Sequence, residues 1–230
     1  MNDKRIGIIG GMGPEATARF YLKLIERTSV STDQDHFRVI IDSNPKIPDR
    51  TAAILGEGES PVPYIIETGK TLEKAGVDIA CIPCITSHYF FDEVQAGLDF
   101  RIIHAIKALN RYVKSEYPQV KKIGVLSTTG TVKTAIYDKD LNGLEIIYPD
   151  DSTQAENVMQ AIYGEEGIKR GNHGMKPLGL LRIAANKMIA CGAELIIAGC
   201  TEVPIVLKQE HIDVPLIDPM DVVISELIGE

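Results

Sequence analysis

Two cysteines at matched places are the residues of this sequence whose type and spacing could do chemistry. Cys84 and Cys200 each close a short apolar run, in the segments 75–84 and 191–200. A thiol has a reference pKa of about 8.5, close enough to neutrality for both thiol and thiolate to be reached. One thiolate can take a proton from a carbon atom while a second thiol returns a proton to the opposite face. The pair therefore predicts two-base proton transfer at a carbon centre.

The residues after each cysteine predict a helix N-terminus close to the sulfur. Capping residue types come directly before a helix-like stretch in both places: Thr86 and Ser87 in the first, and Thr201 and Glu202, followed by Val203 and Pro204, in the second. The positive end of a helix dipole lowers the pKa of a nearby thiol. The same amides could hold substrate carboxylates and stabilise the charge that develops when the carbon loses its proton.

The other two cysteines, Cys81 and Cys191, fall within or before apolar runs, and we interpret them as buried structural residues. Cys81 and Cys84 also form a CxxC pair, which is typical of redox motifs and of half a zinc site. A zinc site needs two more ligands, and His88 supplies only one. A redox CxxC normally opens a helix, whereas this pair straddles the end of a strand. We therefore expect no metal and no redox role here.

Composition points to a globular protein with a small-molecule partner. Hydrophobic residues make up 44% and charged residues 24% of 230 residues, and the net charge is −8. That charge disfavours nucleic acid and anionic membrane as partners. The apolar runs are too short to span a bilayer and the N-terminus lacks a signal-peptide pattern, so we expect a cytoplasmic protein without disulfides. An acidic substrate would need a local cluster of Arg or Lys.

Strand patterns alternate with helical patterns along the whole chain. Strands are expected at 5–9, 37–42, 77–82, 122–126, 144–148 and 194–198, and helices at 14–28, 61–75 and 175–190. Such alternation is typical of an α/β fold with a parallel sheet covered by helices on both faces.

The two halves of the chain resemble each other. Gly76, Asp78 and Cys84 match Gly192, Glu194 and Cys200 at one offset, segment 6–9 matches 123–126, and segment 102–104 matches 216–218. The alternative is that any two buried strands look alike. Duplication predicts two similar, pseudo-two-fold related domains with both cysteines at strand C-termini, facing one cleft. We expect domains at 1–112 and 113–212, with segment 213–230 a candidate addition to the first.

A glycine-rich turn, Gly11-Met12-Gly13-Pro14-Glu15-Ala16, follows the first expected strand, and Asp42 ends the next one. The spacing fits a dinucleotide fingerprint. The turn could equally bring backbone amides to a small carboxylate, or simply allow a tight strand-to-helix connection. A match to this pattern alone is weak evidence for a nucleotide.

Several motifs together resemble the aspartate/glutamate racemase family, and its aspartate racemase branch most. They run in order over nearly the whole chain: Gly7-Ile8-Ile9-Gly10-Gly11-Met12-Gly13-Pro14, Asn44-Pro45-x-Ile47-Pro48-Asp49-Arg50, Pro83-Cys84-x-Thr86-x-His88, Ser127-Thr128-Thr129-Gly130-Thr131, Ile168-Lys169-x-Gly171 and Gly199-Cys200-Thr201-Glu202. Any one motif would be unspecific, but the set is specific.

The resemblance implies two α/β domains with the site between them, an amino-acid substrate, no cofactor and often a homodimer. It implies Cys84 and Cys200 as the acid/base pair, and Arg50 and Lys169 as cationic partners of the substrate carboxylates. It also implies a pocket lined by Met12, Thr86, Ser87, Thr201 and Glu202. From the residues alone, Arg50 and Lys169 would be interpreted as solvated loop charges.

One position departs from the family pattern. The family usually has Asn directly after the first cysteine, where this chain has Ile85. Losing a hydrogen bond to a charged group costs roughly 1.5–3 kcal/mol. The first hypothesis is an aspartate racemase; the alternatives are a racemase for another amino acid such as glutamate, a catalytically impaired carboxylate binder, and a nucleotide-binding protein. Because both cysteines are present, we do not expect a related decarboxylase or maleate isomerase.

Overall fold

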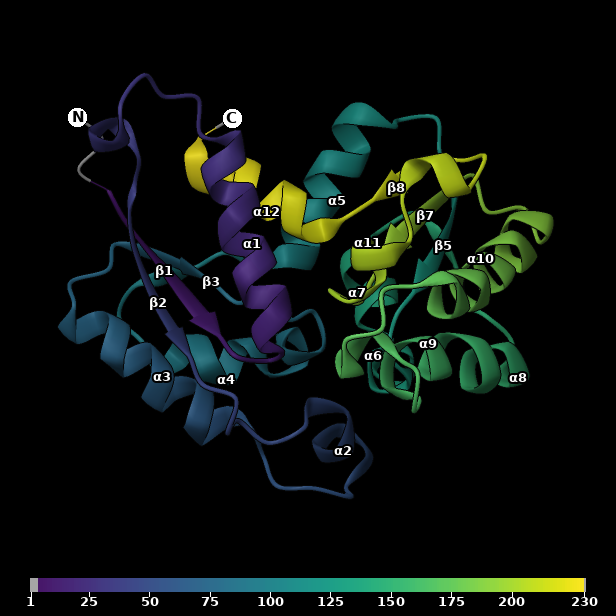
Figure 1. Ribbon diagram of the computed structural model, residues 1–230, viewed down its shortest axis with the longest axis horizontal. Coiled ribbons are helices and arrows are strands. Elements are labelled where there is room, and N and C mark those ends of the chain that lie inside the picture. The colour runs from purple at the N-terminus through teal and green to yellow at the C-terminus, as the bar shows by residue number, and fades with distance from the viewer. Residues whose placement is uncertain (1–3, 230) are drawn as a thin grey trace. The chain divides into compact units, whose positions relative to one another are not determined.

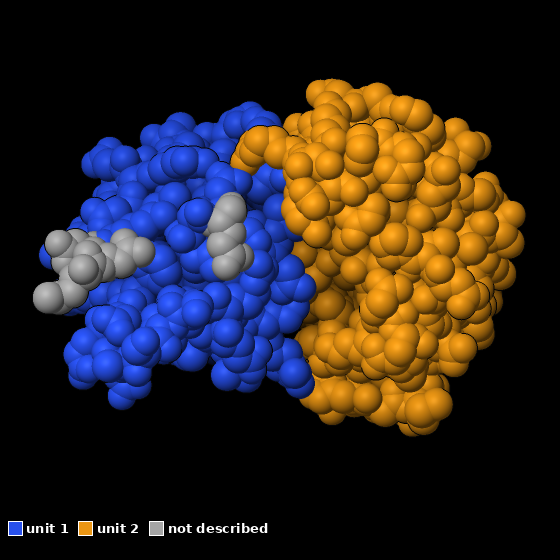
Figure 2. Space-filling view, turned by 90° about the horizontal axis from the view of Figure 1, so that it is seen from above, with its two compact units in different colours: residues 1–108, 220–230 blue, residues 109–219 orange. Residues whose placement is uncertain are grey.

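The computed structural model describes residues 4–229, which form two compact units, coloured separately in Figure 2. The N-terminal unit contains the described residues up to 108 and those from 220 onward, and the C-terminal unit contains residues 109–219. The domain boundaries expected from the sequence stay a prediction. None of the described helices is long and apolar enough to cross a membrane.

Each unit is built on a four-stranded parallel sheet (Figure 1). The first sheet contains β1 (Arg5–Gly10), β2 (Arg38–Ser43), β3 (Ile79–Cys81) and β4 (Arg101–Ile102), in the order β2-β1-β3-β4. The second contains β5 (Lys122–Leu126), β6 (Glu145–Ile147), β7 (Leu195–Ala198) and β8 (Leu216–Ile217), in the order β6-β5-β7-β8. The parallel α/β architecture with two similar sheets is thereby confirmed.

Helices connect these strands. The N-terminal sheet is accompanied by α1 (Pro14–Arg27), α2 (Arg50–Leu55), α3 (Val62–Lys74), α4 (Phe91–Ala96) and α12 (Pro219–Ile228), and α5 (Ala105–Glu116) runs from one unit into the other. The C-terminal sheet is accompanied by α6 (Thr129–Thr134), α7 (Ile136–Asp140), α8 (Asp151–Thr153), α9 (Gln160–Tyr163), α10 (Met175–Ala190) and α11 (Val203–Val206). Short 3₁₀ turns lie at Asp33–Asp35, Thr86–Phe90, Ile168–Arg170 and Gln209–His211, and a π-helical stretch at Gln154–Met159.

The repeat seen in the sequence corresponds to the same bonds in both units. Asp78, just before β3, accepts a hydrogen bond from the Arg5 amide at 2.7 Å, and Glu194, just before β7, accepts one from the Lys122 amide at 2.9 Å. Each carboxylate therefore fixes the start of the central strand beside it. Buried strands that merely look alike would not repeat this side-chain bond.

A second repeated feature was not predicted. Gln95 donates to the Phe100 carbonyl at 2.9 Å and accepts from the amide of Ile102 at 2.8 Å. Gln209 makes the same two bonds at the same sequence spacing, to the Val214 carbonyl and the Leu216 amide, both at 2.9 Å. Each glutamine thus holds the loop that leads into the last strand of its sheet.

The C-terminal helix α12 is fixed to the N-terminal unit, next to α1 (Figure 1). Lys23 of α1 pairs with Asp221 at 2.8 Å, and Arg27 donates to the Asp221 carbonyl at 2.7 Å and to Ser225 at 2.8 Å. These bonds account for the return of the chain to this unit after β8.

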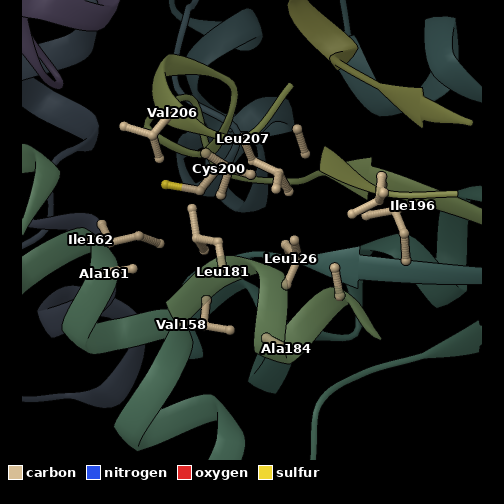
Figure 3. Packing of buried hydrophobic residues seen from close by; sticks show 14 of the residues in the cluster. Leu126, Val158, Ala161, Ile162, Leu181, Ala184, Ile196, Cys200, Val206 and Leu207 are labelled. Carbon is tan, nitrogen blue, oxygen red and sulfur yellow. The ribbon is translucent and has the colours of Figure 1, made fainter. Parts of the chain in front are cut away.

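The core of the C-terminal unit is an apolar cluster to which α10, α11 and the sheet contribute side chains (Figure 3). Leu126 and Ile196 come from the central strands, Leu181 from α10 and Val206 from α11. Cys200 belongs to this cluster, and Figure 3 shows its sulfur directed away from Leu126 and Ile196. The core therefore supports the Cys200 backbone while its sulfur points away from these two side chains.

Candidate active site

Cys84 lies three residues beyond β3, in a loop whose backbone is hydrogen-bonded on both sides of the residue. Its amide donates to the Ile82 carbonyl at 2.7 Å. Its carbonyl accepts from Ser87 Oγ at 2.6 Å and from His88 Nδ1 at 3.0 Å. The Cys84 residue is 5% exposed. The loop around the thiol is thus held by bonds within the protein.

The 3₁₀ turn after Cys84 does not have the cap expected from the sequence. Its N-cap residue is Ile85, and no side chain caps the turn. The Ser87 hydroxyl is used instead by the Cys84 carbonyl, because a serine at this position reaches back to the preceding turn. The prediction that Thr86 and Ser87 act as N-caps is therefore wrong. Both residues are nevertheless buried, as is Ile85, which follows Cys84 directly.

His88 is a buried histidine packed between aromatic rings. Its ring stacks on Phe91 with 5.9 Å between centroids and meets His104 edge-on at 5.2 Å. Burial, followed by the charge of His104, lowers the pKa of His88 to about 4. The side chain is therefore neutral near pH 7, and because a carbonyl only accepts hydrogen bonds, its proton lies on Nδ1.

The sulfur of Cys200 is hydrogen-bonded to Glu202, which in turn is paired with Lys169. Its Sγ donates to Glu202 Oε2 at 2.9 Å, and the other oxygen of Glu202 accepts from Lys169 Nζ at 2.6 Å. Thr201 Oγ1 donates to the same carboxylate at 3.2 Å. These four predicted residues lie together in the C-terminal unit, with Glu202 at the centre.

The thiol of Cys200 is harder to ionise than the sequence predicted. Burial raises its pKa well above the usual value, and the negative charge of Glu202 raises it further, while Lys169 acts in the opposite direction. The expected net lowering is wrong for Cys200, because burial and the Glu202 carboxylate outweigh the lowering by the Glu202 backbone amide at the start of the four-residue helix α11. Cys200 is accordingly a thiol at neutral pH.

Lys169 and Arg50 are not the solvated charges that the sequence alone suggested. The Lys169 ammonium is paired with Glu202 and lies 5.4 Å from the centre of the Tyr163 ring. Arg50, 8% exposed, donates to the carbonyl of Pro48 at 3.0 Å and to that of Met12 at 3.4 Å. The two cations belong to different units, and Arg50 is brought together with Met12.

In the glycine-rich turn, the backbone amide of Gly11 is hydrogen-bonded within the turn and its helix. Gly11 has a φ of +93°, and a Cβ there would lie 2.3 Å from the Asn44 backbone, so only glycine fits. Its amide donates to Thr17 Oγ1 at 2.9 Å. The turn therefore meets the requirements of a tight strand-to-helix connection, which was one of the interpretations of the sequence.

The two remaining cysteines differ from each other. Cys81 is buried in β3, donates to the Gly7 carbonyl at 3.8 Å, and has its pKa raised by burial, as expected of a structural thiol. Cys191 is exposed at the end of α10, so its interpretation as a buried residue is wrong. Helix α10 ends one residue before Cys191, and the buried strand β7 begins only at Leu195, so Cys191 lies in the exposed connection between them. Within residues 4–229, no three His, Cys, Asp or Glu side chains cluster as a metal site would require.

Tyr137 is a residue near Cys200 that the sequence gave no reason to select. It is fully buried, and a Cβ placed on Gly199 would lie 3.0 Å from its hydroxyl. Burial raises its pKa well above the usual value. The only signal in the sequence was the glycine before Cys200, which leaves the room that the phenol ring occupies.

A buried thiol bonded to a carboxylate, in one of two similar parallel-sheet units, is an arrangement of the α/β class that is suited to proton transfer. Comparison with known proteins names the family. The sequence pattern of the Asp/Glu/hydantoin racemase family matches residues 9–227, and the chain belongs to this family. The resemblance found in the sequence is thereby confirmed, and the protein is an amino-acid racemase, an isomerase with a small amino-acid substrate.

Individual relatives show a range of substrates. The chain is 32% identical to the broad specificity amino-acid racemase RacX of Bacillus subtilis, over 93% of this chain and 92% of that protein. The aspartate racemase of Picrophilus torridus superposes with a TM-score of 0.84 at 28% identity, covering 98% and 93% of the two chains. An aspartate racemase homologue from Pyrococcus horikoshii gives 0.77 at 30% identity, covering 98% of each. Glutamate racemase of Francisella tularensis, at 19% identity and a TM-score of 0.70 over 100% of this chain and 81% of its own, shares the fold.

Proposed function

We propose that Cys84 and Cys200 are the acid/base pair of this racemase and serve opposite faces of the substrate α-carbon, without a cofactor. The observation that carries the proposal is the bonded chain from Cys200 Sγ through Glu202 to Lys169. A structural cysteine has no need of a carboxylate at its sulfur. Cys84 occupies the corresponding place after the matching strand of the other sheet.

The chain of charged groups gives Cys200 a way to change its protonation state. As an acid, the thiol gives its proton to the substrate carbanion, and Lys169 offsets the two negative charges then present on sulfur and Glu202. As a base, Cys200 first passes its proton to Glu202, 2.9 Å away, and takes the α-proton as a thiolate. On the other face Cys84 donates as a thiol when Cys200 is the base. When Cys200 is the acid, Cys84 takes the α-proton as a thiolate, after its own proton has passed to solvent.

Aspartate is the substrate we propose, interconverted between its L and D forms. Support comes from the two solved relatives described as an aspartate racemase and its homologue, at 28% and 30% identity. In a protein of net charge −8, Arg50 and Lys169 supply the local positive charge that two substrate carboxylates require. Met12, Thr86, Ser87, Thr201 and Glu202 complete the proposed pocket, with Ile85 as its apolar member.

A racemase of broader specificity is the second candidate, and two observations favour it. The relative at 32% identity over 93% of this chain is described as a broad specificity racemase. Ile85 is apolar and 2% exposed, so it cannot offer the hydrogen bond that an asparagine would give to a substrate carboxylate. A pocket with one polar contact fewer discriminates less strongly against uncharged side chains.

A homodimer is the assembly that we propose. Family resemblance implies it, and α1 offers a surface for it, because a second apolar stripe runs along its outer face. The stripe consists of Ala18, Tyr21, Leu22 and Ile25, in which each residue has partners three and four positions away, and Leu22 is 54% exposed. Arg19 and Glu26 flank it seven residues apart, so that an antiparallel second copy would bring unlike charges together.

Exchange of the α-proton in D₂O tests the acid/base proposal. Reduced protein is incubated with L-aspartate, L-glutamate or uncharged amino acids, and loss of the α-proton is followed together with chiral analysis. Wild type and the matched control Cys191→Ser should form D-aspartate at equal rates. Cys84→Ser and Cys200→Ser should each be slower by at least about 100-fold with an unchanged circular dichroism spectrum. The pair is falsified if either variant racemises at nearly the wild-type rate in both directions.

The same assay separates the two substrate candidates. Exchange that is fastest with aspartate supports the first, and comparable exchange with uncharged amino acids supports the second. In the second case Ile85→Asn should shift the preference toward aspartate, because it restores a donor beside Cys84.

A further inference from the structure

We propose that Ser87 and His88 are positioning residues of the racemase, which hold Cys84 through the carbonyl of its own peptide unit. This inference rests on the proposed role of Cys84 as an acid/base group. His88 lies outside the proposed substrate pocket and Ser87 within it, and in this role both act through the backbone of the cysteine.

The hydrogen bonds at Cys84 leave its backbone little freedom. A carbonyl oxygen has two lone pairs, and at Cys84 the Ser87 hydroxyl and the His88 ring both donate to that oxygen, at 2.6 and 3.0 Å. The Cys84 amide is bonded in turn to the Ile82 carbonyl at 2.7 Å. With both peptide groups fixed, rotation about Cα–Cβ is the main freedom that the thiol retains.

The ring of His88 is itself held in place, which makes it a precise donor. The imidazole is 2% exposed, stacks on Phe91 and meets the edge of His104, and the His88 amide donates to the Ile85 carbonyl at 2.9 Å. His88 and Cys84 are four residues apart, and the intervening 3₁₀ turn brings the ring back over the cysteine. A neutral imidazole has one proton to donate, and here the carbonyl receives it.

Cys200 is held by other means, which shows that the arrangement at Cys84 is not a general property of the duplicated fold. Its carbonyl accepts from the backbone amide of Val203 at 2.9 Å, and its sulfur is bonded to Glu202. The residue four positions after Cys200 is Pro204, where Cys84 has His88. One cysteine is therefore oriented through its peptide group and the other through its thiol.

The position of the thiol matters because proton transfer from carbon needs the sulfur at a fixed place relative to the α-carbon. A displacement of the order of 1 Å at a catalytic group can slow a reaction by about 100-fold. Loss of the His88 bond should therefore lower kcat while leaving KM for aspartate within about twofold, because His88 is not one of the proposed pocket residues.

The test uses variants that differ in one donor. In His88→Asn the amide nitrogen takes the place of Nδ1 and keeps the bond, and in His88→Leu the donor is lost at a similar volume. Ser87→Thr and Ser87→Ala form the second pair, in which Ser87→Ala removes a single oxygen and keeps the fold. Each full-length variant is assayed for kcat and KM in D₂O exchange, and for the rate at which iodoacetamide modifies Cys84 and Cys200.

We expect kcat to fall about tenfold to 100-fold in His88→Leu, and at least about threefold in Ser87→Ala, with recovery of most of the rate in His88→Asn and Ser87→Thr. Modification of Cys84 should change by at least about threefold, whereas that of Cys200 should not change. An equal change at both cysteines, or a wild-type kcat in His88→Leu and Ser87→Ala, would overturn the inference. Because modification is measured without turnover, these outcomes stay distinct from a failure of the acid/base role, which Cys84→Ser reports.

Discussion

Acid should destabilise the N-terminal unit through His88, and replacing that histidine should remove the effect. The folded protein holds His88 neutral, with its pKa lowered from 6.5 to about 4 by burial and by His104. Once the chain unfolds, the ring meets water and its pKa returns to the ordinary value. Between these two pH values the unfolded chain therefore binds a proton that the folded chain does not bind.

The magnitude follows from that difference in proton binding. The free energy of unfolding falls as the pH drops through this window, by about 1.4 kcal/mol for each pH unit in which only the unfolded state is protonated. A window of about 2.5 pH units amounts to about 3 kcal/mol. Above pH 6.5 the contribution of His88 is fully present, and below about pH 4 no more is lost from this group.

Urea unfolding followed by circular dichroism measures the effect, since the chain has no tryptophan. Wild type and His88→Asn are compared at pH 7.5, 6, 5 and 4. The asparagine keeps the donor but cannot titrate; it loses ring packing, which lowers stability equally at every pH. The variant should therefore lose about 3 kcal/mol less than wild type between pH 7.5 and 4. Parallel pH profiles for the two proteins would refute a neutral, buried His88.

Three further variants test other contacts. Glu202→Gln should move the pH midpoint of Cys200 alkylation downward, because the carboxylate raises the thiol pKa while Lys169 remains to lower it, and an upward shift would contradict the charge chain. Gly199→Ala should lower the free energy of unfolding by roughly 1–3 kcal/mol, because its Cβ would come within 2.9–3.0 Å of three side chains; an unchanged urea midpoint would contradict that crowding. Leu22→Glu should convert a dimer to a monomer in light scattering without loss of helix, and a persistent dimer would place the interface elsewhere.

Most of the secondary structure could be predicted from the sequence, because its signals are local. Helix α10 begins and ends where the apolar spacing indicated, at Met175 and Ala190, and α1 begins at Pro14, a residue that favours the first helical turn. The offset between Asp78 and Glu194 correctly indicated duplication, since a residue kept at the same place in both halves makes the same bond to a strand start.

Predictions about individual side chains failed where the outcome depends on contacts that residue type does not determine. Ser87 has the type of an N-cap but bonds backward to a carbonyl, a choice that residue type does not determine. Cys191 precedes an apolar run but lies where the helix has already ended, so it is exposed. The Gln95 and Gln209 bonds were missed because a glutamine carries no signal in sequence that it will serve a loop.

The electrostatics of Cys200 show why a motif can single out a candidate catalytic thiol and still mislead about its protonation state. The sequence Cys200-Thr201-Glu202 places a carboxylate two residues after the thiol. From the sequence alone, a helix dipole would lower the pKa of Cys200 and the carboxylate would raise it, and the relative sizes of the two effects are not given. Geometry decides between them: the carboxylate is 2.9 Å from the sulfur, and the helix beyond it spans four residues. Burial keeps the thiol protonated, and its nearest charged neighbour adds to that effect. The same carboxylate is the group to which we propose that the thiol passes its proton. The part of the raised pKa that comes from Glu202 and the proposed proton relay depend on one hydrogen bond, so Glu202→Gln should alter both together.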